Sequence, residues 1–312
     1  MRTPWIQVED LHLSRGGRPV LHGVTVSAVG RAVGLVGANG AGKSTLIGAL
    51  LGVLRPDRGK IRVLGLDVPR DARELRARAG VMAEQAGIFP GGSGVEAVVF
   101  SGMLSGLARR EALRRAHRAL DALEVGEERY RGTREYSTGM RQRCKLAMAL
   151  VHDPEILILD EPTVGLDPPG RAQFLALLRE LRDGGRRLLL STHLLPDAES
   201  VCDELLLLDA GTVGYSGGLD SLRRASRVEF SAEGPGLDDA FAAALGANGV
   251  AARVIDAAAG SAASLRFDGG AEALSSFWRL AAERGAAVRR LDRDSPELED
   301  AVLEAMGVSH PR

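Results

Sequence analysis

The sequence predicts an α/β fold built around a largely parallel sheet, followed by a small α+β domain. Apolar runs of strand length alternate with segments of helical periodicity, which is typical of a parallel sheet covered by helices. A glycine-rich loop joins one of these runs to a helix. The character of the chain then changes near residue 222. We therefore expect a first domain over residues 1–222 and a second over residues 223–312.

The composition is that of an ordinary globular protein. Of the 312 residues, 45% are apolar and 26% are charged, and the net charge of −1 comes without a block of like charges. Nothing in this balance predicts binding to nucleic acid. Cys144 and Cys202 are far apart without a metal-ligand spacing, so we expect buried thiols.

The chain shows neither a secretion signal nor a membrane span. Its longest uncharged apolar runs, such as Ile156–Leu159 and Leu205–Leu208, fall far below the ~18 residues that a span requires. We expect a soluble, cytoplasmic chain that works at a membrane only through a partner.

The first domain is expected to begin with strands and to continue with alternating helices and strands. The expected strands are Trp5–Val8, Val20–Val29, Ala32–Val36, Lys60–Leu64, Gly80–Ala83, Ile156–Leu159 and Arg187–Ser191. The expected helices are 43–54, 95–125, 138–152 and 170–182. Turn sequences such as Asp183-Gly184-Gly185 separate them.

The second domain is expected to have the order β-α-β-β-α-β and a closing helix. Its expected elements are strand 227–231, helix 237–245, strands 252–256 and 264–267, helix 272–284, strand 287–291 and helix 296–306. This order predicts a ferredoxin-like split unit. Because the segment holds no cluster of catalytic residue types, an interaction or regulatory role fits it better than chemistry.

The glycine-rich loop fits the phosphate-binding pattern G-x-x-x-x-G-K-S between a strand and a helix. Its residues are Gly37, Ala38, Asn39, Gly40, Ala41, Gly42, Lys43 and Ser44, and Thr45 follows. Backbone N–H groups and the helix N-terminus can bind phosphate oxygens, Lys43 can reach the outer phosphates, and Ser44 can bind Mg²⁺. Chance is a poor explanation, because the pattern uses one of only three lysines.

Two acids follow a buried strand. Asp160 and Glu161 come directly after Ile156–Leu159, where one carboxylate can hold Mg²⁺, directly or through water, and the other can orient or deprotonate a water. Such a pair is weak alone, because solvated strand ends are common. Together with the phosphate loop it predicts phosphoryl chemistry.

The order of the remaining motifs resembles the nucleotide-binding subunit of an ATP-binding cassette (ABC) transporter. The resemblance covers roughly residues 6 to 220. The segment Tyr136–Gln142, here named the signature segment, is similar to the family's Leu-Ser-Gly-Gly-Gln. Gln85, Gly165-Leu166-Asp167 and Ser191-Thr192-His193 match further family motifs, in the family's order.

The resemblance implies a P-loop ABC-type ATPase with a role for each matching residue. Two such domains, expected to be identical, would enclose two ATP molecules, with Ser137 and Gly139 of one completing the phosphate loop of the other. Glu161 would polarise the water and His193 would contact the γ-phosphate. Asp160, Ser44 and Gln85 would bind Mg²⁺. Gln85 would also couple the site to separate membrane-spanning subunits, and Asp167 would bridge the two domains.

The sequence departs from the family pattern at several positions. Arg15 stands where an adenine-stacking aromatic residue is usual, although a guanidinium can also lie over a purine. The signature segment has Thr138 and Met140, a form similar to that of multidrug and antibiotic exporters. Leu298-Glu299-Asp300 near the end resembles the tail of such subunits. We therefore expect the ATPase of an exporter, on the inner face of the cell membrane.

Two other functions are open for this sequence. Soluble members of the superfamily act on ribosomes or DNA, but they typically have two fused cassettes or a long coiled coil, and neither pattern occurs here. A regulatory module without hydrolysis would not need the full set of Lys43, Asp160, Glu161 and His193. The transported substrate has no signal in the sequence.

Overall fold

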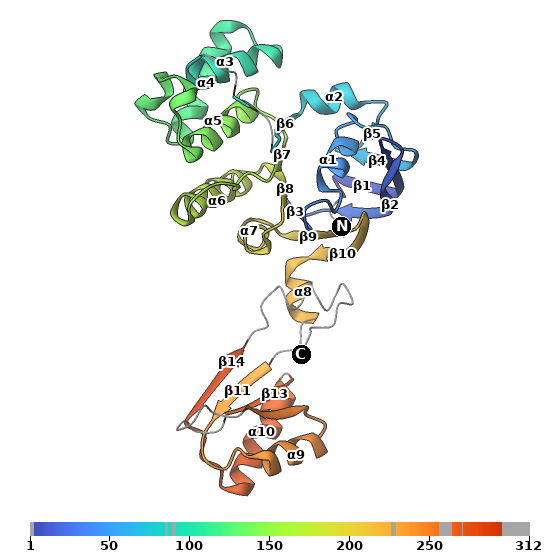
Figure 1. The fold of residues 1–312 in the computed structure, drawn as a ribbon, viewed down its shortest axis with the longest axis vertical. Coiled ribbons are helices and arrows are strands. Elements are labelled where there is room, and N and C mark those ends of the chain that lie inside the picture. The colour runs from blue at the N-terminus through green and yellow to red at the C-terminus, as the bar shows by residue number, and fades with distance from the viewer. Residues whose placement is uncertain are drawn as a thin grey trace. The chain divides into compact units, whose positions relative to one another are not determined.

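The computed structural model describes residues 3–84, 87–88, 92–225, 229–255, 264–269 and 271–294. The chain divides into two compact units, Met1–Leu219 and Asp220–Arg312 (Figure 1). In the described part of the chain, none of the helices combines the length and apolar character needed to cross a bilayer.

The first unit contains a four-stranded antiparallel sheet near the N-terminus. Its strand order is β2-β1-β4-β5. The strands are β1 (Ile6–Arg15), β2 (Arg18–Ala28), β4 (Arg58–Val63) and β5 (Leu66–Val68). β1 and β2 alternate buried and exposed residues along much of their length, as expected of a sheet with one face on a core.

The central sheet of the first unit has six strands in the order β10-β9-β3-β8-β7-β6. They are β3 (Ala32–Val36), β6 (Ala79–Met82), β7 (Ile156–Asp160), β8 (Arg187–Thr192), β9 (Glu204–Asp209) and β10 (Thr212–Gly218). All neighbours are parallel except β10 and β9. The predicted parallel sheet is therefore present, and every residue of β3 and β7 is buried.

Helices of the first unit connect its strands, with α3, α4 and α5 in succession between β6 and β7. They are α1 (Lys43–Leu50), α2 (Ala72–Ala77), α3 (Gly94–Leu104), α4 (Arg109–Ala122), α5 (Thr138–Leu150), α6 (Pro168–Asp183) and α7 (Leu195–Val201). Figure 1 shows α3, α4 and α5 grouped at one end of the unit, and α1 beside the antiparallel sheet at the other. The region expected to be helical over 95–125 is two helices, because the chain turns at Gly106 with a φ of 93°.

One apolar core joins the two sheets of the first unit. Side chains of β1, β2 and β4 pack with α1 and with β3, β7, β8 and β9, and Leu11, Leu35 and Leu46 are among the most deeply buried. Burying one such leucine contributes about 1.5–3 kcal/mol. This packing fixes α1, and with it the phosphate loop, against the central sheet.

The second unit has the expected β-α-β-β-α-β order. Its elements are β11 (Glu229–Glu233), α9 (Asp239–Ala247), β12 (Ala252–Ile255), β13 (Ser264–Asp268), α10 (Ala271–Arg284) and β14 (Arg290–Asp294), after the short helix α8 (Leu219–Ala225). The strand order β12-β13-β11-β14 is fully antiparallel. The last strand begins three residues later than expected. The expected helix 296–306 lies outside the described residues.

Four phenylalanines form the centre of the second unit. Phe230 and Phe267 stack with ring centroids 5.2 Å apart, and Phe267 and Phe277 stack at 4.6 Å. Phe241 meets Phe277 edge to face at 5.6 Å. The two helices are therefore held against one face of the sheet by aromatic packing.

Candidate nucleotide site

The phosphate loop connects the end of β3 to the start of α1, and its geometry requires glycine at several positions, of which Gly37 and Gly42 are the clearest. A Cβ at Gly37 would lie 2.2 Å from the carbonyl oxygen of Leu208 on the neighbouring strand β9. Gly42, directly before α1, has a φ of 104°, where a side chain would be strained. The N-terminus of α1 therefore opens onto the loop, as phosphate binding requires.

Lys43 is buried inside the loop and is fully engaged. Its Nζ donates to the carbonyl oxygens of Gly37 at 2.8 Å and Ala38 at 3.3 Å. The same Nζ lies 3.3 Å from Oε1 of Glu161. The ammonium group is thus fixed between the loop and the end of β7, where it can contact the outer phosphates of a nucleotide.

Asp160 receives a hydroxyl on each carboxylate oxygen. Ser44 Oγ donates to Oδ2 at 2.8 Å, and Ser191 Oγ donates to Oδ1 at 2.7 Å. The register of the central sheet explains the second contact, because Asp160 of β7 pairs with Ser191 of β8. Hydroxyl and carboxylate oxygens are the ligands that Mg²⁺ prefers, so Ser44 and Asp160 form a donor set that fits this ion.

Glu161 follows β7 in a backbone conformation that is rare for a residue with a side chain. Its φ is 50°, and its N–H donates to the carbonyl oxygen of Ser191 at 2.9 Å. Its Oε2 lies 2.9 Å from Nδ1 of His193, the first residue after β8. Backbone strain of this kind is common at functional sites, because the surrounding structure must hold it in place. The glutamate is therefore fixed between the lysine of the loop and the histidine.

Lys43, Ser44 and Glu161 line a cleft of about 380 Å³. Its walls are Asn39, Gly40, Gly42, Lys43, Ser44, Thr45 and Glu161, together with Arg15, Val20 and Glu84. The structure thus places Arg15 on the same cleft as the loop. Sequence reasoning missed Val20 and Glu84, whose only signals were closeness to Arg15 and to Gln85. Gln85 itself lies outside the described residues.

The signature segment lies on a different surface of the chain. Ser137 caps α5, and its Oγ accepts a hydrogen bond from the N–H of Met140 at 3.2 Å. Ser137 and Gly139 line a separate cavity of about 220 Å³ together with Leu166 and Gly170. Asp167 caps α6 through the N–H of Gly170 at 3.3 Å. None of the described residues that line the cleft of the phosphate loop belongs to the signature segment.

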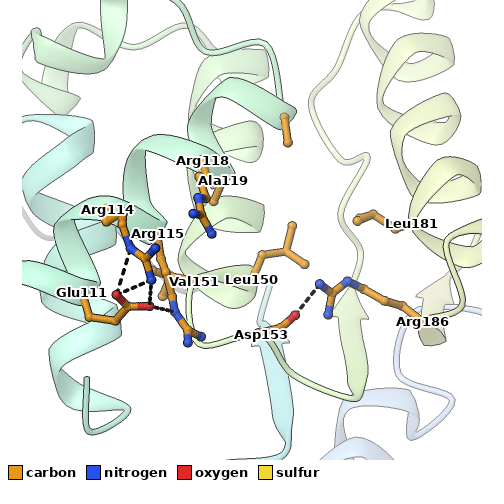
Figure 2. A pocket seen from close by; sticks show the side chains of 11 residues that line it. Glu111, Arg114, Arg115, Arg118, Ala119, Leu150, Val151, Asp153, Leu181 and Arg186 are labelled. Carbon is orange, nitrogen blue, oxygen red and sulfur yellow. Dashed lines mark hydrogen bonds and ion pairs between the residues drawn. The ribbon is translucent and has the colours of Figure 1, made fainter. Parts of the chain in front are cut away.

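A third cavity, of about 370 Å³, is lined by residues of α4 and by Asp153 and Arg186, which precede β7 and β8 (Figure 2). Arg114, Arg115 and Arg118 of α4 face Arg186, which precedes β8. Its two carboxylates are engaged: Glu111 by Arg114 and Arg115, and Asp153 by Arg186 at 2.6 Å. The hydrogen bonds from Arg115 and Arg114 lower the pKa of Glu111. Because Asp153 precedes β7 whereas Asp160 ends it, this cavity is not part of the nucleotide site.

Comparison with known proteins identifies the family of the chain. Residues 23–164 match the ABC transporter family model. The daunorubicin resistance ATP-binding protein DrrA3 of Streptomyces coeruleorubidus is 38% identical over 219 residues, which cover 70% of this chain and 69% of that protein. The chain belongs to the ABC transporter ATP-binding family. It is an ATP-binding, ATP-hydrolysing subunit.

Other proteins similar to this ABC subunit include a second exporter subunit and a solved structure. The Nod factor export ATP-binding protein I of Ralstonia nicotianae is 36% identical, with 67% of this chain and 65% of that protein covered. A solved structure of an ATP-binding subunit of an ABC transporter is 31% identical to this chain and superposes on it with a TM-score of 0.62. The match covers 70% of this chain and 92% of the solved one. ABC cassettes dimerise and work with membrane permease subunits, so both kinds of partner are expected for a member of this family.

Proposed function

We propose that two copies of this chain close around two ATP molecules and thereby drive a membrane exporter formed by separate permease chains. One observation carries this proposal. Glu161 is held at the nucleotide cleft between Lys43 and His193, whereas Ser137 and Gly139 lie on another surface of the same chain. A complete site of this kind therefore needs the signature segment of a second chain.

Within one chain, the cleft supplies the binding and acid–base groups. Lys43 and the N–H groups at the start of α1 would hold the β- and γ-phosphates. Glu161 would orient the attacking water and accept its proton, while His193 fixes the carboxylate through Nδ1 and contacts the γ-phosphate. Ser44 and Asp160, with Gln85, would hold Mg²⁺, which neutralises charge on the phosphates.

The second chain would add the groups that this cleft lacks. Ser137 caps α5, and the N–H groups of the first helical turn, including that of Gly139, can receive a γ-phosphate. Asp167 caps α6 and would bridge the two chains. ATP would thus stabilise the closed pair, and hydrolysis would reopen it.

The export role rests on the relatives and on the signature segment. The relatives are named for daunorubicin resistance and for Nod factor export. We assign this chain to the cytoplasmic face of the cell membrane, paired with a second identical chain. The permease would select the cargo, and the second unit of the chain would serve contact or regulation.

The Glu161→Gln variant tests the proposal, because it should bind ATP but hydrolyse it poorly. Light scattering should report a doubled mass with ATP and Mg²⁺, and the single-chain mass with ADP. Adding Ser137→Arg should abolish the doubling while one-chain ATP binding remains. A single-chain mass in saturating ATP would contradict the proposal.

Affinity purification from gently solubilised membranes separates the exporter from the nucleic-acid alternative. We expect a protein with several membrane spans to copurify with the tagged chain. Recovery of ribosomes or DNA at physiological salt, without such a protein, would favour the soluble branch of the superfamily.

A further inference from the structure

Asp197 is a completely buried carboxylate outside the nucleotide cleft. It lies on α7, four residues after His193, and its exposed fraction is 0%. Oδ2 accepts a hydrogen bond from Thr163 Oγ1 at 2.5 Å, and Oδ1 accepts one from Arg171 Nε at 2.5 Å. A buried charge is tolerated only with such partners, so the position of this carboxylate is firmly determined.

The two donors come from the segments that carry Glu161 and Asp167. Thr163 is buried and lies two residues after Glu161. Arg171 lies in the first turns of α6, which Asp167 caps. Asp197 therefore joins three segments: the helix after His193, the loop after Glu161, and the helix after Asp167.

Glu161 itself is tied to β8 by its N–H, which donates to Ser191, and the rest of the loop up to residue 167 is held by short turns and by α5. The N–H of Val164 donates to the carbonyl oxygen of Glu161 at 3.3 Å, a long contact. Gln142 of α5, one turn beyond the signature segment's Gly139, donates from Nε2 to the carbonyl oxygen of Val164 at 3.2 Å. The hydrogen bond from Thr163 to Asp197 is shorter than both and ties the loop to α7.

This arrangement bears directly on the contact between Glu161 and His193. Their 2.9 Å contact depends on the loop after β7 and the segment after β8 keeping one relative position. Asp197 is attached to the second segment and binds the first. We propose that Asp197 is a positioning residue for ATP hydrolysis, acting through Thr163 on Glu161 and His193. The inference rests on the catalytic roles proposed above for these two residues.

Thr163→Val is the sharpest test. It removes the hydroxyl at nearly constant volume and leaves the ion pair between Asp197 and Arg171, so the fold should be retained. Because misplacing a catalytic group by a fraction of an ångström is costly, we expect kcat to fall about tenfold. The KM for ATP should stay within about twofold, because the phosphate loop is untouched. Thr163→Ser, which keeps the hydroxyl, should restore kcat.

Two further variants separate positioning from simple stabilisation. In a His193→Ala background, Thr163→Val should cost less than about twofold, because both changes disturb one arrangement. Asp197→Asn keeps a contact to Thr163 but loses the charge opposite Arg171, and its kcat should fall without a matching rise in KM.

Three results would overturn the positioning role. The first is a wild-type kcat for Thr163→Val. The second is the full tenfold loss of kcat when Thr163→Val is added to His193→Ala. The third is a change in the kcat and KM of the variants that only follows a fall in their melting temperature. Glu161→Gln is measured in parallel. If that variant hydrolyses ATP at the wild-type rate, the proposed function fails, whatever Thr163→Val shows.

Discussion

The ammonium group of Lys43 and the carboxylate of Glu161 lie 3.3 Å apart, and both side chains are more than 90% buried. One belongs to the phosphate loop and the other to the end of β7. Each therefore serves as the countercharge of the other. In the proposed function, ATP binding would redirect Lys43 toward phosphate oxygens. Glu161 would then be free to act on water while His193 holds it.

Breaking this ion pair should lower stability as well as binding. Lys43→Met leaves the Glu161 carboxylate buried beside His193 without its lysine, and we expect a loss of about 3 kcal/mol in the free energy of unfolding. The double variant Lys43→Met with Glu161→Gln should recover most of that loss. Urea unfolding without nucleotide measures both, and equal stability of the two variants would contradict the countercharge role.

His193→Ala should impair hydrolysis much more than ATP binding. The variant removes the group that holds Oε2 of Glu161 at 2.9 Å, whereas the loop and Lys43 are unchanged. We expect kcat to fall about a hundredfold and the Kd for ATP to change by less than about threefold. The matched control is His117→Ala on α4, which should hydrolyse ATP normally. A large loss of ATP affinity would assign His193 to ground-state binding instead.

Arg15 should recognise the base, because it lines the cleft beside the loop at the position expected for adenine stacking. Arg15→Ala should weaken ATP binding about threefold, in line with an exposed cation–π contact. It should leave the affinity for tripolyphosphate unchanged, and Arg15→Phe should bind ATP at least as well as the wild type. Arg31→Ala is the control. Equal losses for ATP and tripolyphosphate would assign Arg15 to the phosphates.

Both native thiols should be unreactive in the folded chain. Burial raises the pKa of Cys144 to about 12 and also raises the pKa of Cys202 well above its usual range. The reactive thiolate is therefore scarce at neutral pH. A maleimide at pH 7 should label neither cysteine in the native protein and both in urea, as mass spectrometry can show. Rapid native labelling would contradict the buried environment.

Much of the site could be predicted because its residues follow short, strongly patterned segments. The loop ending in Lys43 and the acids Asp160 and Glu161 each come after an apolar strand, and parallel strands bring their carboxyl ends to one edge. The sheet register then explains why Ser191 meets Asp160. Here local pattern and global topology point to the same place.

Contacts between distant segments had no such signal. Arg171 and Asp197 meet because α6 and α7 pack side by side, and Thr163 joins them from the loop before α6. None of the three shows its partner in the sequence. The strand β14 was expected too early, because its pairing with β11 includes residues 290–294, of which only Leu291 is apolar. Helix 95–125 was expected to be continuous, because isolated glycines such as Gly102 and Gly106 are also tolerated inside helices.

Crosslinking across the two chains tests the composite site most directly. One chain carries Ser137→Cys and a differently tagged chain carries Asn39→Cys, both in the Glu161→Gln background, where the native cysteines are buried. A short bismaleimide should join the two tags in the presence of ATP and Mg²⁺, and not with ADP or with Val53→Cys in place of Asn39→Cys. Failure to crosslink in ATP, or an equal yield without nucleotide, would contradict a site shared between two chains.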